Sequence, residues 1–316
     1  KKPTRVIIDQ DGGIDDALAL ILALRSPELD VAAITAVSGN VTVEQATLNG
    51  LRVVDLLNRG DVPVAGGMAN PLVRDAVRAT SFHGKDGLGD SHLPISRIHP
   101  TEKNALDTIS EELTVSKRRE LSIICTGPLT NIAALLTSFP ESGKMIKELV
   151  IMGGAYGVTE YGVGNVTPVA EFNIYADPEA AKIVFESRVP LEVVGLDVTM
   201  NPKNQLTLTE YIGIKKSKGR VATFAARILD QNIHKHRIFA LHDPMTVATK
   251  VRPSLFKFAS YRVQVETKGE ITTGMTVADR RVRLPEAEMQ GEKIMICENV
   301  DSRGFKRLFL DRLTRA

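Results

Sequence analysis

Short apolar runs recur along the chain, and segments with apolar positions at helical spacing lie between them. The runs are continuous rather than alternating, which is typical of strands buried on both faces of a parallel sheet. Strands are predicted at 5–9, 31–37, 121–126, 148–153 and 191–197, and helices at 15–25, 43–58, 130–138 and 178–187. The alternation predicts right-handed βαβ units, and so an α/β fold with an open, mostly parallel, Rossmann-like sheet flanked by helices.

The rest of the chain contains further predicted helices and no sign of a second domain. The polar stretch 200–237 is predicted to be helical and to overhang the sheet, and 301–316 has the pattern of a capped amphipathic helix. The charge run at 215–220 is typical of a solvated face. No low-complexity linker or internal repeat appears, so residues 1–316 are expected to form a single domain.

Composition excludes several classes of function. The chain has 43% hydrophobic residues, which is enough for a large core, and its net charge of +2 gives no bulk attraction to nucleic acid or membrane. It has no tryptophan and no apolar run long enough to span a bilayer. Cys125 and Cys297 lie in apolar runs and are expected to be buried strand thiols. Low cysteine usage favours a reducing compartment, so a cytoplasmic location is expected.

Polar and glycine-rich segments follow each predicted strand. The first strand precedes DQDGGIDD, the next two precede SGN and TGPLTN, and the last two precede MGGAYG and DVT. A further apolar run, 238–241, precedes His242 and Asp243. Because ligands of open α/β sheets bind outside the carboxyl ends of the strands, these segments predict a site at one edge of the sheet.

The first of these segments holds four carboxylates, Asp9, Asp11, Asp15 and Asp16, within eight residues. Asp15 or Asp16 can cap the following helix, but capping explains only one of the four. Mutual repulsion would raise their pKa values unless a cation were present. Oxygen ligands favour Ca²⁺ or Mg²⁺, and no nearby pattern of His and Cys offers a zinc site.

Three functions fit these residues. Phosphotransferases of the haloacid-dehalogenase type also begin with Asp-x-Asp-Gly, but they normally have Thr or Ser where this chain has Gly13. A metal-stabilised binding module without catalysis would need the cation but no positioned acid such as His242. A hydrolase would use the metal to bind a polyhydroxylated substrate and to activate water.

Several segments taken together resemble the inosine-uridine type nucleoside hydrolase family. The family pattern Asp-x-Asp-Pro-Gly-x-Asp-Asp is matched at 9–16, except that Gly12 replaces proline, which is expected to loosen the turn. VSGN at 37–40, TGPLTNIA at 126–133, GNVTPVAEFNIYADPEAA at 164–181 and HDP at 242–244 match in order. The resemblance covers essentially residues 5–300.

The resemblance implies a Ca²⁺-dependent enzyme that hydrolyses the N-glycosidic bond of ribonucleosides in salvage or catabolism. Asp11 would accept a proton from the attacking water, and His242, with a pKa near neutrality, would protonate the leaving base. The implied metal ligands are Asp11, Asp16, the carbonyl of Thr126, and Asp243. The implied substrate contacts are Asp15 and Asn173 at the 2′-hydroxyl, Asn40 at the 3′ side, and Asn165 and Glu171 at the 5′-hydroxyl, with His83, Met152, Phe172 and His234 as further candidates.

The resemblance also assigns supporting roles and partners. Asp9 is expected to lie behind the metal ligands, and Asn131 is expected to be structural. His236 is a second candidate, beside His234, for contacting the base. The expected partners are a small-molecule ribonucleoside and further copies of the chain in a homodimer or homotetramer. The absence of tryptophan favours the broader inosine-uridine branch, and a purine preference remains an alternative.

Overall fold

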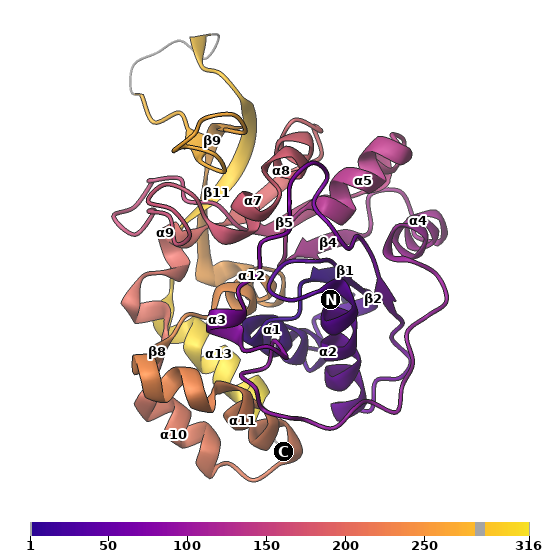
Figure 1. The fold of residues 1–316 in the computed structure, drawn as a ribbon, viewed down its shortest axis with the longest axis vertical. Coiled ribbons are helices and arrows are strands. Elements are labelled where there is room, and N and C mark those ends of the chain that lie inside the picture. Colours follow the sequence, from indigo (N-terminus) through magenta and orange to yellow (C-terminus); the bar gives the residue numbers. More distant parts are fainter. Residues whose placement is uncertain (1, 282–287, 316) are drawn as a thin grey trace.

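The computed structural model describes residues 2–281 and 288–315, which build one large sheet (Figure 1). Its nine strands lie in the order β10-β9-β11-β6-β5-β4-β1-β2-β3. The five strands predicted from the sequence are present and all parallel, and β1 lies between β2 and β4. The strands are β1 Thr4–Gln10, β2 Leu29–Ala36, β3 Val64–Gly66, β4 Ser122–Cys125, β5 Glu148–Met152, β6 Leu191–Val194, β9 Phe256–Val265, β10 Thr276–Ala278 and β11 Glu292–Val300.

One end of the sheet departs from the parallel pattern. β11 runs parallel to β6, but β9 is antiparallel to β11 and β10 is antiparallel to β9. β9 is only partly buried along its length, so it lacks the continuous apolar run that marks the central strands. The sequence analysis therefore missed β9 and β10, and the sheet is mixed at this end.

Helices cover both faces of the sheet (Figure 1). One apolar cluster joins α1, α11, α12 and α13 to one face, and a second joins α4, α5 and α8 to the other. α1 is buried almost all round, as expected of a helix between the sheet and other helices. The helices are α1 Ile14–Leu24, α2 Val43–Leu56, α3 Thr80–His83, α4 Ala105–Val115, α5 Thr130–Ser138, α6 Ser142–Met145, α7 Phe172–Ala176, α8 Pro178–Phe185, α9 Leu196–Thr199, α10 Leu208–Lys216, α11 Arg220–His236, α12 His242–Val251 and α13 Ser302–Thr314, with short 3₁₀ turns η1 Pro202–Asn204 and η2 Pro253–Leu255.

The stretch 200–237 is largely helical, as predicted, and holds α10 and α11. The apolar run after it is not a strand of the main sheet. Only Ile238–Phe239 is extended, as β8, and it pairs antiparallel with β7 (Leu206–Thr207) in a separate two-stranded sheet. His242 and Asp243 therefore enter the site as the first residues of α12 and not from a strand end.

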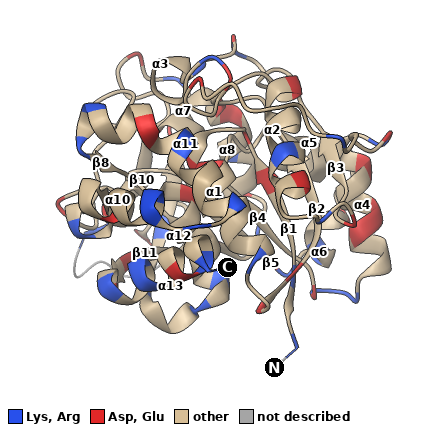
Figure 2. Ribbon diagram, turned by 90° about the horizontal axis from the view of Figure 1, so that it is seen from below, with Lys and Arg blue, Asp and Glu red and all other residues tan. Residues whose placement is uncertain are grey.

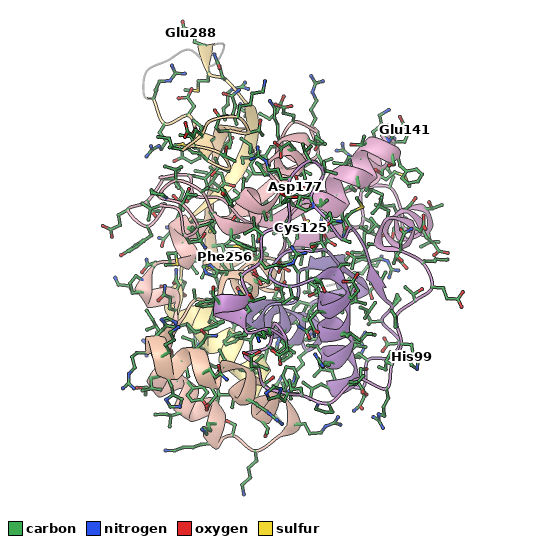
Figure 3. The ribbon with its side chains drawn as sticks, viewed as in Figure 1. His99, Cys125, Glu141, Asp177, Phe256 and Glu288 are labelled. Atoms are coloured by element: carbon green, nitrogen blue, oxygen red, sulfur yellow. The ribbon has the colours of Figure 1, made fainter. Side chains whose placement is uncertain are left out.

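Surface charge and cysteine placement agree with the composition. In the view of Figure 2, lysine, arginine and acidic residues are interspersed over the ribbon. Cys125 in β4 and Cys297 in β11 are buried and unpaired, and Cys125 lies well inside the molecule (Figure 3). Within 2–281 and 288–315, no helix has the length and apolar character to cross a membrane.

Candidate active site

The turn after β1 is built around Gly12, which has a φ of +81°. Proline is fixed near a φ of about −65° and cannot adopt this conformation. A Cβ at Gly12 would lie 2.6 Å from the Cα of Ala46, and the Gly12 carbonyl accepts a hydrogen bond of 2.8 Å from Asn49 Nδ2. Helix α2 therefore packs directly against this turn, and the expectation that glycine loosens it stays a prediction.

Asp16 and Asp11 are held by the loops around α1. Asp16 accepts hydrogen bonds from the backbone N–H of Gly13 (2.7 Å) and from Thr126 Oγ1 (2.7 Å), so it caps the helix and ties it to the end of β4. The two carboxylate oxygens of Asp11 accept from the backbone N–H and the side-chain amide of Asn40, each at 2.8 Å. The amide of Asn40 therefore orients Asp11, and the contact with the ribose assigned to Asn40 from the sequence stays a prediction.

Asp9 lies behind this pair, within β1. Its Oδ1 accepts from Thr35 Oγ1 (2.6 Å) and from Asn131 Nδ2 (2.8 Å). Asn131 also donates to the carbonyl of Ala36, and its Oδ1 accepts from the backbone of Met68. Asn131 therefore connects β1, β2 and the segment after β3, which is the structural role predicted for it.

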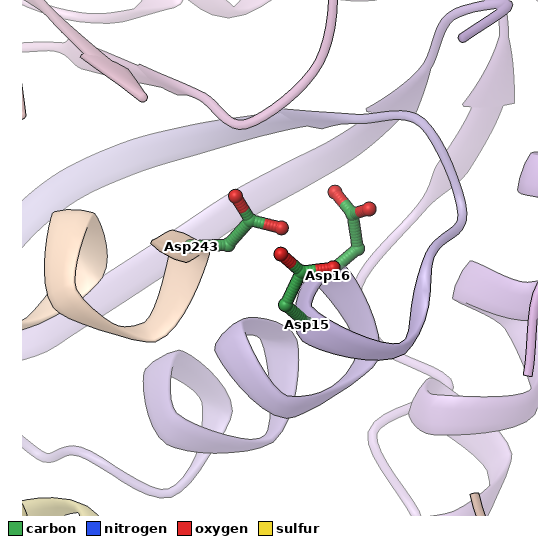
Figure 4. A group of neighbouring side chains, drawn as sticks. All are labelled: Asp15, Asp16 and Asp243. Carbon is green, nitrogen blue, oxygen red and sulfur yellow. The ribbon is translucent and has the colours of Figure 1, made fainter. Parts of the chain in front are cut away.

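Asp15, Asp16 and Asp243 form a compact carboxylate cluster (Figure 4). One oxygen from each lies within 4.8 Å of the others, and all three residues are buried. Asp243 comes from the first turn of α12 and faces the first turn of α1, so two helix N-termini meet at the cluster. Asp15 Oδ1 is buried without a hydrogen-bond partner among the described residues.

Burial shifts the protonation of these acids. It raises the pKa of Asp15 to about 8 and that of Asp9 to about 7. Burial and neighbouring carboxylates raise the pKa values of Asp11 and Asp243 well above their usual range. A divalent cation among these oxygens would replace the protons and supply the missing partner of Asp15 Oδ1. The oxygen-rich donor set therefore fits a hard metal ion.

A second group of polar side chains comes from the segment before α8. Asn173 Nδ2 donates to the carbonyls of Thr126 (2.9 Å) and Met152 (3.2 Å), at the ends of β4 and β5. Glu171 accepts from three backbone N–H groups, including that of Gly154 at 3.0 Å, and burial raises its pKa. Asn165 Oδ1 accepts from the backbone of Phe172 at 3.0 Å. Backbone contacts thus orient all three side chains.

Two histidines line the cavity from different elements, His83 buried at the end of α3 and His242 partly buried at the start of α12. His83 Nδ1 accepts from the backbone N–H of Ile14 at 3.1 Å and lies 3.8 Å from Asp15 Oδ1, and burial lowers its pKa to about 3. His242 Nδ1 lies 2.8 Å from Thr199 Oγ1, and burial lowers its pKa to about 4. Desolvation thus penalises the charged imidazolium of His242, and its predicted role as a proton donor stays a prediction.

These groups line one cavity of about 540 Å³, a volume suited to a small organic ligand. Its lining combines carboxylates and amides with apolar side chains such as Val77, Phe82 and Ile238. Of the residues predicted from the sequence, the cavity is lined by Asp15, Asn40, His83, Thr126, Met152, Asn165, Glu171, Phe172, Asn173, His242 and Asp243.

Three predicted residues lie elsewhere. Asp11 and Asp16 are buried behind the lining, next to the carboxylates that face the cavity. His234 is exposed on α11, where it packs edge-on against Tyr211 and lies 3.7 Å from Asp230. The structure does not bring His234 into the cavity, and its neighbour His236 lines it instead.

The structure also adds residues that the sequence analysis did not select. Phe82, Met200 and Gln205 line the cavity. Phe82 stacks with His236 at a centroid distance of 5.9 Å, which joins α3 to the end of α11. Phe82 could have been selected from the sequence because it adjoins His83. Met200 and Gln205 lie in none of the motifs.

Comparisons with known proteins agree with the geometry. The model of the family described as inosine-uridine preferring nucleoside hydrolase matches residues 6–307. A pyrimidine-specific ribonucleoside hydrolase, RihA, of Escherichia fergusonii is 42% identical, over 98% of this chain and 97% of its own length. A plant nucleoside hydrolase structure superimposes with a TM-score of 0.88 at 33% identity, covering 99% of this chain and 100% of that one. A purine-preferring ribonucleoside hydrolase from Gardnerella vaginalis gives 0.86 at 32% identity, covering 98% of each chain.

Proposed function

Because this chain belongs to the inosine-uridine preferring nucleoside hydrolase family and is a nucleosidase, we propose that it uses Ca²⁺ to hydrolyse the N-glycosidic bond of inosine- and uridine-like ribonucleosides. The products are ribose and the free base. The observation that carries the proposal is the buried carboxylate cluster at the floor of a nucleoside-sized cavity.

The metal ligands proposed are Asp11, Asp16, the carbonyl of Thr126, and Asp243. The position of Asp15 beside Asp16 and Asp243 supports a site in which Asp15 also faces the ion or the sugar bound to it. When bound, the ion supplies positive charge that orients sugar hydroxyls and makes a nearby water more acidic. The high carboxylate count favours a divalent cation, and the flexible oxygen coordination of Ca²⁺ fits carboxylates from two helices and one strand end.

Asp11 is the proposed general base. Two donors from Asn40 hold its carboxylate in one orientation, which limits the reorganisation needed when it accepts a proton from the attacking water. The N-glycosidic bond breaks through an oxocarbenium-like sugar, and the neighbouring carboxylates stabilise its positive charge. Asp15, Asn173, Asn165 and Glu171 are proposed to bind the ribose hydroxyls.

His242 is the proposed donor of a proton to the leaving base. With a pKa of about 4, it is protonated in only about one molecule in a thousand at pH 7. For nucleosides whose leaving base must be protonated, the rate should therefore rise as the pH falls. Substrates whose leaving group needs no proton should not show this rise. The hydrogen-bonding position of Thr199 fixes the imidazole ring so that its other nitrogen remains for the base.

The outer cavity suits a planar base. Its apolar rim includes Val77, Phe82, Phe172 and Ile238. RihA is named pyrimidine-specific and the Gardnerella vaginalis structure purine-preferring, so both classes of base occur among relatives of this chain. Uridine and inosine are the proposed representative substrates.

The test is to incubate the protein with inosine, uridine, guanosine or cytidine in phosphate-free buffer containing Ca²⁺, and to measure reducing sugar and free base. The expected result is equimolar ribose and base from at least inosine or uridine. Asp11→Asn, which keeps the shape but removes the basicity, should abolish release. A wild-type protein that binds nucleosides without releasing ribose would overturn the proposal in favour of a binding module.

A further inference from the structure

We propose that Gln205 reads the nucleobase by accepting a hydrogen bond from an N–H group on the base edge remote from the ribose. The inference rests on the proposed function, because it concerns the base half of the same cavity. It assigns a specificity-determining role to a residue outside the motifs of the sequence.

Gln205 reaches the cavity through the small second sheet. It follows η1 and immediately precedes β7, where Leu206 pairs with Phe239 of β8. Continuing this antiparallel register places Gln205 opposite Ala240, two residues before His242. Gln205, Ala240 and His242 all line the cavity. Gln205 therefore belongs to the same wall as the proposed proton donor to the base.

The side-chain amide of Gln205 is buried and only half satisfied. Its Nε2 donates to the carbonyl of Met200 at 3.3 Å, and this contact fixes which end of the amide carries the N–H groups. Its Oε1 is buried and has no hydrogen-bond partner in the part of the chain that the structure describes. An unpaired buried acceptor costs free energy, and a bound donor would recover it.

Along this wall, Met200, Ile238 and Ala240 present apolar side chains to the cavity, and the second ring nitrogen of His242 is assigned to the leaving base. The last torsion of a glutamine side chain is broad, so the amide can turn toward a bound base; the turn gives up the 3.3 Å contact with Met200, and the hydrogen bond from the base replaces it. An acceptor in apolar surroundings discriminates strongly between a ligand that brings a donor and one that does not.

The chemical class that fits is a base with a lactam or imide N–H opposite the glycosidic bond. Uracil and hypoxanthine both carry such a group. Replacing its hydrogen by a methyl group removes the donor while keeping the planar ring. The sensitivity of the enzyme to this methyl group therefore measures the contact.

The experiment compares kcat/KM on two matched pairs, uridine with 3-methyluridine and inosine with 1-methylinosine, using the pair whose parent the wild-type enzyme hydrolyses. The variants are Gln205→Met, which keeps the length without the amide, and Gln205→Asn, which shortens the side chain but stays polar. Asn204→Leu is the matched control. Asn204 is also a buried amide that donates to a backbone carbonyl and has an unpaired oxygen, but it does not line the cavity.

In the wild type, the parent nucleoside should be preferred by about 10- to 100-fold, the range expected when a buried acceptor loses its donor. Both Gln205 variants should reduce that ratio at least tenfold, whereas Asn204→Leu should leave it unchanged. A wild-type ratio near one would overturn the inference without any variant. An unchanged ratio in a folded Gln205 variant would overturn it too. If the wild type hydrolyses neither parent, the proposed function itself has failed.

Discussion

Removing divalent cations should make the stability of this protein fall as the pH rises from 7 to 9. In the folded metal-free protein, burial raises the pKa of Asp15 to about 8 and that of Asp9 to about 7. Both carboxyls are fully ionised in the unfolded chain at these pH values. A group with a raised folded-state pKa contributes stability below its unfolded pKa and loses it as the pH rises through the folded pKa. The loss should therefore extend across pH 7 to 9.

The magnitude follows from linkage. Between pH 7 and 9, ionisation of Asp15 in the folded protein lowers the free energy of unfolding by about 1.4 kcal/mol. Ionisation of Asp9 lowers it by about 0.4 kcal/mol. His83 and His242 have lowered pKa values and act in the opposite direction, but by only about 0.3 kcal/mol together, since the unfolded histidines are nearly neutral above pH 7. Together these four groups account for a loss of about 1.5 kcal/mol, or roughly 2 °C in Tm for a chain of this length. The raised pKa values of Asp11 and Asp243 act in the same direction.

The assay measures the free energy of unfolding by denaturant at pH 7, 8 and 9 for chelator-treated protein. The wild type is compared with Asp15→Asn and with Asp75→Asn, an exposed control. The buried thiols of Cys125 and Cys297 add a slope in every variant, so the difference from Asp15→Asn isolates the buried carboxyl. Asp15→Asn should reduce the fall in the free energy of unfolding between pH 7 and 9 by about 1.4 kcal/mol. Saturating Ca²⁺ should remove the same share of the fall in the wild type and leave the share due to the thiols. Equal slopes in wild type and Asp15→Asn would refute the view that Asp15 is protonated when metal is absent.

Three further predictions follow from the site. Asp243→Asn should weaken Ca²⁺ binding, measured by calorimetry, by about 10-fold or more, because it removes one carboxylate from the cluster; unchanged affinity would exclude Asp243 as a ligand. His242→Ala should lower kcat/KM on inosine or uridine by about 10²–10⁴ but spare 4-nitrophenyl riboside, and the wild-type ratio of these rates should rise as pH falls from 8 to 6; equal losses on both substrates would remove the proton-donor role. Asn131→Leu should lower the free energy of unfolding by about 1–3 kcal/mol, because Asp9 and the Ala36 carbonyl lose a buried donor; a variant as stable as wild type would contradict that account.

The central sheet and the floor of the cavity could be predicted because each leaves a local signal. Strands buried on both faces require continuous apolar runs, and the residues after them, such as Asp11 and Thr126, gather at one edge by topology alone. The antiparallel end could not be predicted in the same way, since β9 is half exposed and its pattern is irregular.

Residues on the cavity walls left less signal. Gln205 reaches the cavity only because β7 pairs with β8, a contact between segments more than thirty positions apart. His234 and His236 are indistinguishable in sequence, but α11 ends at His236, so only the latter meets Phe82 at the rim. The low pKa of His242 depends on burial by several elements and is likewise invisible in the motif.

At Gly12 this chain departs from the family pattern, which has proline at this position. Where the family pattern has proline, this chain uses a left-handed glycine with α2 packed directly against it. On either side of this glycine, Asp11 and Asp16 accept hydrogen bonds from Asn40 and Thr126.

The central claim is that a metal held by the carboxylate cluster is required for ribose release. The most direct measurement removes all divalent cations from the protein, confirms by circular dichroism that it remains folded, and titrates Ca²⁺ back while following ribose release from uridine or inosine. The account predicts no release without metal and saturable recovery that reaches its plateau at one bound Ca²⁺ per chain. Full activity in the metal-free protein would contradict it.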